Sequence, residues 1–158
     1  KYKHIPTHKE MGNILKDSIK THEGIKRSNI PISFTEFFDS SVNVEWAKNT
    51  LKLIHSGQNI ESVNIEIQVF MINEVILVGI PGEVFVEIGL DIKEKSTLDN
   101  TFVIGYTNGY IGYIPTSKAH QEGGYEVERA FKYFGYPSNF EPQIDELIKN
   151  SVYRIIST

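Results

Sequence analysis

The chain has 158 residues, 40% of them hydrophobic and 23% charged, which is typical of a soluble globular domain large enough to bury a core. Its formal net charge of −4 argues against a nucleic-acid-binding surface, which needs a clustered excess of Lys and Arg. It contains no cysteine, which excludes disulfides, thiolate nucleophiles and cysteine-ligated zinc sites.

Targeting signals are not visible in the sequence. No apolar run approaches the roughly 18 residues that indicate a membrane span, and no signal peptide can be recognised. The first residues, KYKHIPTHKE, do not resemble a natural N-terminus. We therefore expect a soluble protein without a transmembrane segment. The sequence does not indicate its cellular compartment.

The first third of the chain predicts two helices and an edge strand. Apolar residues recur at helical spacing over residues 9–22, and Gly24 follows as a stop signal. Residues 30–38 are rich in β-branched and aromatic side chains, and the proline among them favours a sheet edge. Asn43 can cap a second helix, which Gly57 ends.

The rest of the chain predicts a sheet with covering helices. Residues 63–69 alternate between apolar and polar, as a strand with one wet face does. A turn at Asn73-Glu74 leads to the apolar run VILVGI (75–80), which is typical of a strand buried on both faces. Residues 101–106 predict a third core strand. Two further helices are predicted, with inner faces formed by Val84, Phe85, Ile88 and Ile92 and by Ile144, Leu147, Ile148 and Val152, the second with Pro142 in its first turn.

These elements predict a single α/β domain over residues 1–158, a layered structure with a mixed β-sheet flanked by helices. Two loops leave the ends of its buried strands, GIPGE and YTNGYIGYIPT. If those strands are parallel neighbours, Glu83 and the tyrosine-rich loop share one rim of the sheet, where α/β proteins bind ligands. Glu83 is expected in the first turn of its helix, where an ionised carboxylate is stabilised and can serve as a metal ligand.

Each of these features also has an ordinary structural interpretation. A glutamate in a first helical turn commonly only compensates the helix dipole, and Tyr110 and Tyr113 can pack over a sheet edge. His4 and His8 have a metal-like spacing, but a proline lies between them and no glutamate follows as a base. His120 either supports the site or is an exposed surface residue. The other two histidines fall near predicted helix C-termini, where an imidazolium is stabilised.

Two stretches together resemble a known family. VILVGIPGEVFVEIGLDIKEKS, followed by TFVIGYTNGYIGYIPTSKAHQEGGYEVERA, is similar to the neutral/alkaline, non-lysosomal ceramidases, above all to their short bacterial relatives. The resemblance extends over residues 45–128 and is strongest in these two motifs. It implies a zinc-dependent amide hydrolase of sphingolipid metabolism, which splits the N-acyl bond of ceramide into sphingosine and a fatty acid.

The resemblance also implies roles for individual residues. Glu83 and Tyr113 match two zinc ligands of the family, and Tyr125 matches a catalytic tyrosine that hydrogen-bonds the reacting carbonyl. Tyr110, Asn108 and His120 are expected as pocket-lining residues. A zinc ion lowers the pKa of its bound water to about 7, and the oxyanion then needs a preplaced donor such as a phenol.

The family's two histidine ligands have no counterpart in this chain. The resemblance therefore implies that residues 1–158 are the C-terminal part of a catalytic domain, with zinc completed by histidines outside the chain. The expected partners are an N-acyl amide or lipid substrate, the N-terminal half of the same protein, and a second copy in a homodimer. Two rival hypotheses stay open: a ceramidase-like domain that has lost its metal, and an α/β domain whose tyrosine loop binds a partner.

Overall fold

The computed structural model describes residues 6–27, 34–58 and 62–157. The chain folds into two compact units, one formed by Val63–Ala130 and Phe140–Thr158, the other by Tyr2–Ser62 and Phe131–Asn139. The mixed sheet and its flanking helices confirm the predicted α/β class. That residues 1–158 are one part of a larger catalytic domain stays a prediction.

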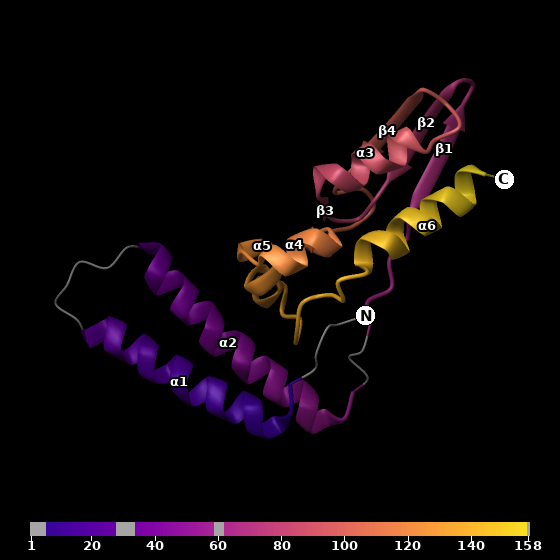
Figure 1. Ribbon diagram of the computed structural model, residues 1–158. Helices are drawn as coiled ribbons and strands as arrows, with labels where there is room; N and C mark the ends of the chain where they lie inside the picture. Colours follow the sequence, from indigo (N-terminus) through magenta and orange to yellow (C-terminus); the bar gives the residue numbers. More distant parts are fainter. Residues whose placement is uncertain (1–5, 28–33, 59–61, 158) are drawn as a thin grey trace. The chain divides into compact units, whose positions relative to one another are not determined.

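The helical unit consists of α1 (His8–Arg27) and α2 (Phe34–Ser56), which lie side by side (Figure 1). Its core is formed by Met11, Trp46 and Ala47, with Leu15, Leu51, Ile54 and Phe131 packed against it. The indole N–H of Trp46 donates a hydrogen bond to the carbonyl of Tyr136 (2.6 Å), which fixes the segment 131–139 to α2. The first predicted helix is confirmed and is longer than expected.

Three predictions for this unit are wrong. Gly24, the predicted stop of the first helix, lies inside α1. Residues 34–38 are helical rather than part of an edge strand, and residues 30–33 of that predicted strand lie outside the described residues. Asn43 lies inside α2 and caps nothing; its side-chain oxygen accepts a hydrogen bond from Lys132 (2.9 Å). Stacking of Phe38 on Tyr133 illustrates the tertiary contacts that override β propensity here. Gly57 ends the helix as predicted, with a φ of +63°.

The sheet of the second unit has the order β1-β2-β4. Strand β1 (Gln68–Ile72) pairs antiparallel with β2 (Val75–Gly79) through a turn at Asn73, whose φ is +52°. Strand β2 pairs parallel with β4 (Asn100–Ile104), and α3 (Val86–Glu94) forms the crossover between them. The condition on which the shared rim of the two loops depended, a parallel pairing of these strands, is therefore met. Residues 63–67 alternate in burial as predicted, but they lie outside the strand.

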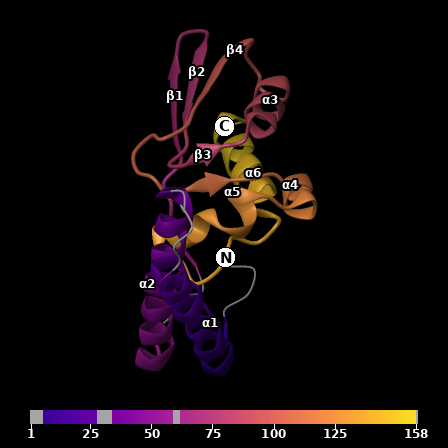
Figure 2. The same ribbon diagram turned by 90° about the vertical axis from the view of Figure 1, so that its left-hand side faces the viewer.

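One face of this sheet is covered and the other is not. Ile76 and Val78 are fully buried, and α3 and α6 (Ile144–Ile156) lie on one side of the strands (Figure 2). On the other face Val75 and Leu77 are only half-buried, and Phe102 is 52% exposed. The prediction that the strand VILVGI is buried on both faces is therefore wrong: only the face with Ile76 and Val78 is fully buried.

Helices α3 and α6 are joined by a polar cluster. The Tyr153 hydroxyl donates to Asp91, and Lys95 and Lys149 form ion pairs with the same carboxylate at 2.8 and 3.7 Å. The hydrogen bonds from Lys95 and Tyr153 lower the pKa of Asp91, while burial and the Asp91 charge raise the pKa of Tyr153. In α6 itself Ile148 and Val152 point inward as predicted.

Two details of α6 differ from the prediction. Leu147 is 56% exposed rather than part of the inner face. Pro142 precedes the helix instead of lying in its first turn. In the part of the chain that the structure describes, no helix combines the length and the apolar character needed to cross a membrane.

Candidate active site

A second, two-stranded sheet carries the residues that the motifs single out. Strand β3 (Glu83–Val84) pairs in parallel with β5 (Tyr113–Ile114), and Glu83 lies directly opposite Tyr113. The Glu83 N–H donates to the carbonyl of Gly112 at 2.8 Å. Glu83 and Tyr113 are thus held on neighbouring backbone segments of one rim, as the argument from parallel strands anticipates.

Glu83 does not lie in a first helical turn, so that prediction is wrong. Helix α3 begins at Val86 with Phe85 as its N-cap, and Glu87 is the acidic residue of its first turn. The Pro81-Gly82 break does not lead straight into the helix, because the chain first pairs with β5. The position of the Glu83 carboxylate is therefore set by strand pairing rather than by the helix dipole.

Glycines let three backbone segments approach closely around Glu83. A Cβ added to Gly82 would lie 2.9 Å from the carbonyl oxygen of Gly112, and one added to Gly105 would lie 2.9 Å from the carbonyl oxygen of Gly82. Each clash involves a backbone carbonyl, which cannot rotate away, and at Gly82 the Ile114 side chain is closer still at 2.7 Å. A side chain at either position would force β3 away from its neighbours, so these glycines fix the geometry of the rim.

Three phenols converge on the Glu83 carboxylate. The Tyr110 hydroxyl donates to Glu83 Oε2 at 3.4 Å, and Tyr106 and Tyr113 lie near enough for Glu83 to raise their pKa. The rings of Tyr106 and Tyr110 stack with their centroids 5.1 Å apart. We refer to Tyr106, Tyr110, Tyr113 and Tyr125 as the tyrosine cluster.

Tyr125 joins this cluster through its ring. It begins the short helix α5 (Tyr125–Glu128), directly after Gly124, whose φ is +107°. Its ring packs edge-to-face on Tyr113, with centroids 6.0 Å apart, and the Arg129 guanidinium lies 5.7 Å from its centroid. Both contacts orient the Tyr125 phenol beside the Glu83–Tyr113 pair.

The environment raises the pKa of three of these phenols, those of Tyr106, Tyr110 and Tyr113. The hydrogen bond to Glu83 raises the pKa of Tyr106 to about 12, and burial followed by the negative charge of Glu83 raises the pKa of Tyr113 to about 12. Burial and Glu83 also raise the pKa of Tyr110. At neutral pH these groups are therefore hydrogen-bond donors, and a phenol of this set would lose its proton only to a bound cation or a strong base.

The motifs missed one member of the cluster, Tyr106. It lies two residues after the end of β4 and four residues before Tyr110, and it adopts a φ of +56°, which is rare for a bulky residue. Such strain is found where surrounding structure holds a residue in place, often at functional sites. The only sequence signal for it was a further tyrosine at the start of the same loop.

The remaining residues singled out in the sequence are Asn108, His120, His4 and His8. Asn108 has a φ of +58° in the tyrosine loop, and His120 lies in the last turn of α4 (Ser117–Glu122) rather than in a loop. His4 and the side chain of His8 lie outside the described residues.

A pocket of about 320 Å³ adjoins Glu83 and Tyr106 and is otherwise lined by Val84, Phe85, Val86, Gly89, Leu90, Lys93, Val103 and Gly105. The roles of Asn108, Tyr110 and His120 as lining residues stay predictions.

The side chains near Glu83 and Tyr113 decide whether the described residues could bind a metal ion by themselves. Among the described residues, no group of three or more His, Asp or Glu side chains lies close enough together to hold a metal. Glu83 and Tyr113 offer two oxygen donors, and a catalytic zinc site takes three protein ligands, with histidine nitrogen common among them. The rim therefore offers two oxygen donors, too few for a catalytic zinc site, and such a site would need further donors from elsewhere.

Comparisons with known proteins find a structural similarity over part of this chain. No family model and no curated protein matches the sequence. Among solved structures, the neutral ceramidase from Pseudomonas aeruginosa superimposes with a TM-score of 0.40 at 22% identity, over 54% of this chain and 14% of that chain. An overlap this small carries no argument about activity, which has to come from the residues of the rim.

Proposed function

We propose that this chain contributes half of the active site of a zinc-dependent amide hydrolase. In this proposal Glu83 and Tyr113 supply oxygen ligands, and histidines outside the chain complete the set. The observation that carries it is the direct pairing of Glu83 with Tyr113 across β3 and β5. These residues are far apart in sequence, and they are the two that the ceramidase-like motifs assign to the metal.

The chain's own residues have defined tasks in this site. Tyr110 donates a hydrogen bond to the Glu83 carboxylate and so helps to fix its orientation, and Tyr106 stacks on the Tyr110 ring. The Tyr125 phenol, oriented by Tyr113 and Arg129, donates a hydrogen bond to the oxygen that becomes negative during attack on the amide. Zinc, when bound, would supply an acidified water and polarise the carbonyl.

An apolar pocket supports an N-acyl substrate with an aliphatic chain. It is an open pocket of about 350 Å³ between residues 63–67 and α6, and Ser151 is the single polar residue in its lining. Ile111, which lies between Tyr110 and Tyr113 in the tyrosine loop, contributes to the same lining. An acyl chain in this pocket would therefore have its amide end near the loop that carries the cluster, which favours a lipid amide such as ceramide.

A second candidate function is a binding domain without catalysis. The exposure of the stacked Tyr106 and Tyr110, at 60% and 46%, favours it, because exposed tyrosines are common at protein and ligand interfaces. A domain of this kind would bind through the tyrosine loop and need no metal. Zinc dependence separates the two candidates.

The test uses the full natural polypeptide and an N-acyl amide substrate. We expect turnover that a chelator abolishes and zinc restores, and loss of bound zinc in Glu83→Ala. Tyr125→Phe should keep its zinc and lose on the order of 10²–10³ in kcat, because one oxyanion donor is removed. Tyr133→Phe, which removes a hydroxyl bonded to Asp39 in the helical unit, is the matched control.

Two results would contradict the proposal. Chelator-insensitive turnover would exclude the zinc role, and a zinc-loaded Tyr125→Phe protein with full turnover would exclude the role of Tyr125. Residues 1–158 alone should bind zinc weakly and be inactive, since two oxygen ligands hold a borderline-soft ion poorly. Calorimetric titration of the isolated chain with zinc measures this directly.

A further inference from the structure

An open groove runs beside the candidate site, between α3 and β4. It is the pocket of about 320 Å³ that adjoins Glu83 and Tyr106, and we call it the α3 groove. Helix α3 lies alongside β4, and β3, which carries Glu83, precedes the N-terminal end of the helix (Figure 1, Figure 2). The volume is at the lower end of the range for small-molecule sites, roughly 300–1,000 Å³. The groove therefore leads from the Glu83 carboxylate along one helix.

The walls of the α3 groove are apolar although they are exposed. The apolar lining residues are Val84, Phe85, Val86, Leu90 and Val103. Val86 and Leu90 are four residues apart and so lie on one face of α3, where they are 68% and 59% exposed. A Cβ added to Gly89 would lie 3.8 Å from that of Val103, so helix and strand approach closely here. This lining favours an aliphatic group in a ligand.

Lys93 brings a positive charge to the same groove. It lies in the last turn of α3, seven residues after Val86, which places its Cα about 10 Å farther along the helix axis. Helical side chains lean toward the N-terminus of their helix, and a lysine has a flexible four-carbon stem. The ammonium can therefore reach back toward Glu83, which lines the other end of the groove.

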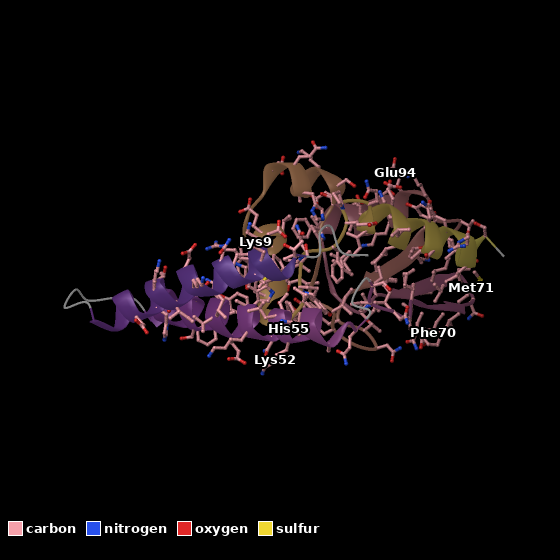
Figure 3. All side chains as sticks on the ribbon, turned by 90° about the horizontal axis from the view of Figure 1, so that it is seen from below. Lys9, Lys52, His55, Phe70, Met71 and Glu94 are labelled. Atoms are coloured by element: carbon pink, nitrogen blue, oxygen red, sulfur yellow. The ribbon has the colours of Figure 1, made fainter. Side chains whose placement is uncertain are left out.

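This charge has no counter-ion in the part of the chain that the structure describes. Lys93 forms no ion pair there, whereas the neighbouring Lys95 is paired with Asp91 at 2.8 Å. Glu94 follows Lys93 directly but does not line the groove, and Figure 3 shows it at the edge of this unit. The net charge of −4 disfavours anions around the chain as a whole, so an anion selected here is selected by a local contact.

The α3 groove and the pocket that Ile111 lines share no lining residue. The first adjoins Glu83, and the second adjoins the tyrosine loop that pairs with Glu83 through Tyr113. An amide held at Glu83 and Tyr113 therefore has two separate places for its two portions. The pocket at Ile111 suits the acyl chain, which leaves the α3 groove for the amine portion.

We propose that the α3 groove binds the amine portion of the substrate and that this portion carries a carboxylate, so that the substrate is an N-acyl amino acid with an aliphatic side chain. The inference rests on the proposed function, because the amide must lie at Glu83 for its amine portion to enter the groove. The carboxylate pairs with Lys93, and the aliphatic side chain contacts Val86 and Leu90. Such a substrate is a lipid amide, and it differs from ceramide in its negative charge.

The reaction balances as an ordinary amide hydrolysis. Water adds to the carbonyl carbon and the C–N bond breaks. The water oxygen stays on the acyl carbon as part of a fatty-acid carboxylate, and its two protons go to the nitrogen, which leaves as the ammonium group of the amino acid. Lys93 takes no part in these transfers. It binds the carboxylate equally in the ground state and the transition state, so it lowers KM and leaves kcat unchanged.

The test uses the full natural polypeptide and two substrates that differ only in the charge. These are N-octanoyl-leucine and N-octanoyl-isopentylamine, which lacks the carboxylate. Turnover gives kcat and KM for each, and calorimetry on the chelator-treated protein gives each dissociation constant without turnover. The variant is Lys93→Met, which keeps an unbranched side chain and removes the charge. Lys118→Met is the matched control, because Lys118 is paired with Glu122 on α4 at 3.3 Å and does not line the groove.

We expect the wild-type protein to favour the leucine compound about three- to tenfold in KM and in the dissociation constant, as for one solvent-accessible contact between charged groups. Lys93→Met should abolish this preference by weakening binding of the leucine compound alone, with kcat unchanged. Lys118→Met should retain the preference.

Three results would overturn the proposal. The first is a wild-type protein without the preference. The second is a Lys93→Met protein that binds both compounds equally more weakly, which is the result expected if the N-terminal half of the protein covers the groove. The third is an equal loss of preference in Lys118→Met. A preference that Lys93→Met abolishes, in a protein that hydrolyses neither compound, supports the ligand of the groove and contradicts the proposed hydrolase. Zinc-dependent turnover of both compounds without a preference does the reverse.

Discussion

Replacing Glu83 by glutamine tests whether Glu83 raises the pKa of Tyr106 and Tyr113 through its negative charge. Glutamine keeps the size and a hydrogen-bond acceptor, so the substitution isolates the charge. The pKa of Tyr106 is raised from 10.0 to about 12, with the hydrogen bond to Glu83 as the largest cause. A rise of this size is roughly a hundredfold in the ionisation constant. Because Tyr106 is 60% exposed, water screens the charge, and we expect Glu83→Gln to lower its pKa by about one unit.

Tyr113 should respond less than Tyr106 in the same variant. Burial is the largest cause of its raised pKa and remains after the substitution, while the charge of Glu83 is only the second cause. An alkaline titration followed by NMR of ring-labelled tyrosine resolves the two residues, with Tyr→Phe variants for assignment. Glu87→Gln, which removes an exposed charge from α3, is the control. An unchanged pKa of Tyr106 in Glu83→Gln, or an equal fall in Glu87→Gln, would refute the assigned cause.

The same pKa values predict how stability depends on pH. Tyr106 and Tyr113 hold their protons more tightly in the folded state than in the unfolded chain, where the pKa is 10.0. Above pH 10 the unfolded chain therefore loses these protons first, and the free energy of unfolding falls as pH rises toward about 12. Below pH 10 the contribution is fully present. Urea midpoints measured across this range should fall less steeply for Glu83→Gln than for the wild type.

Two further substitutions test the framework around the site. Gly105→Ala should lower the free energy of unfolding by about 1–3 kcal/mol, because its Cβ would lie 2.9 Å from the carbonyl oxygen of Gly82. Gly89→Ala in α3 is the comparison: its Cβ would meet only ordinary van der Waals contacts, so it should raise the free energy of unfolding by about 0.5–1 kcal/mol. Equal urea midpoints for the two variants would show that the close approach does not matter. Asp145→Ala should cost about 2–3 kcal/mol, because the carboxylate is 5% exposed and accepts hydrogen bonds from the N–H and hydroxyl of Ser117; a change below the error of the urea midpoint would contradict this.

The sequence by itself determined the elements whose signals are local. Gly57 ends its helix and Asn73 turns its hairpin because their positive φ angles suit these residue types, and the helical spacing of residues 9–22 needed no long-range information. From the sequence, a shared rim for Glu83 and the tyrosine loop followed only on the condition that the two apolar strands are parallel neighbours. The structure meets this condition for β2 and β4, and it pairs Glu83 with Tyr113.

Tertiary structure decided the features that depend on distant contacts. Residues 34–38 have the side chains of a strand but are helical, in a unit where Phe38 stacks on Tyr133 from far along the chain. Glu83 lies in a strand because β5 supplies backbone partners that its own segment does not encode. Tyr106 joins the cluster with a positive φ that directs it toward Glu83. A strained backbone conformation at one residue produces no periodic pattern in the sequence, so it could not be predicted.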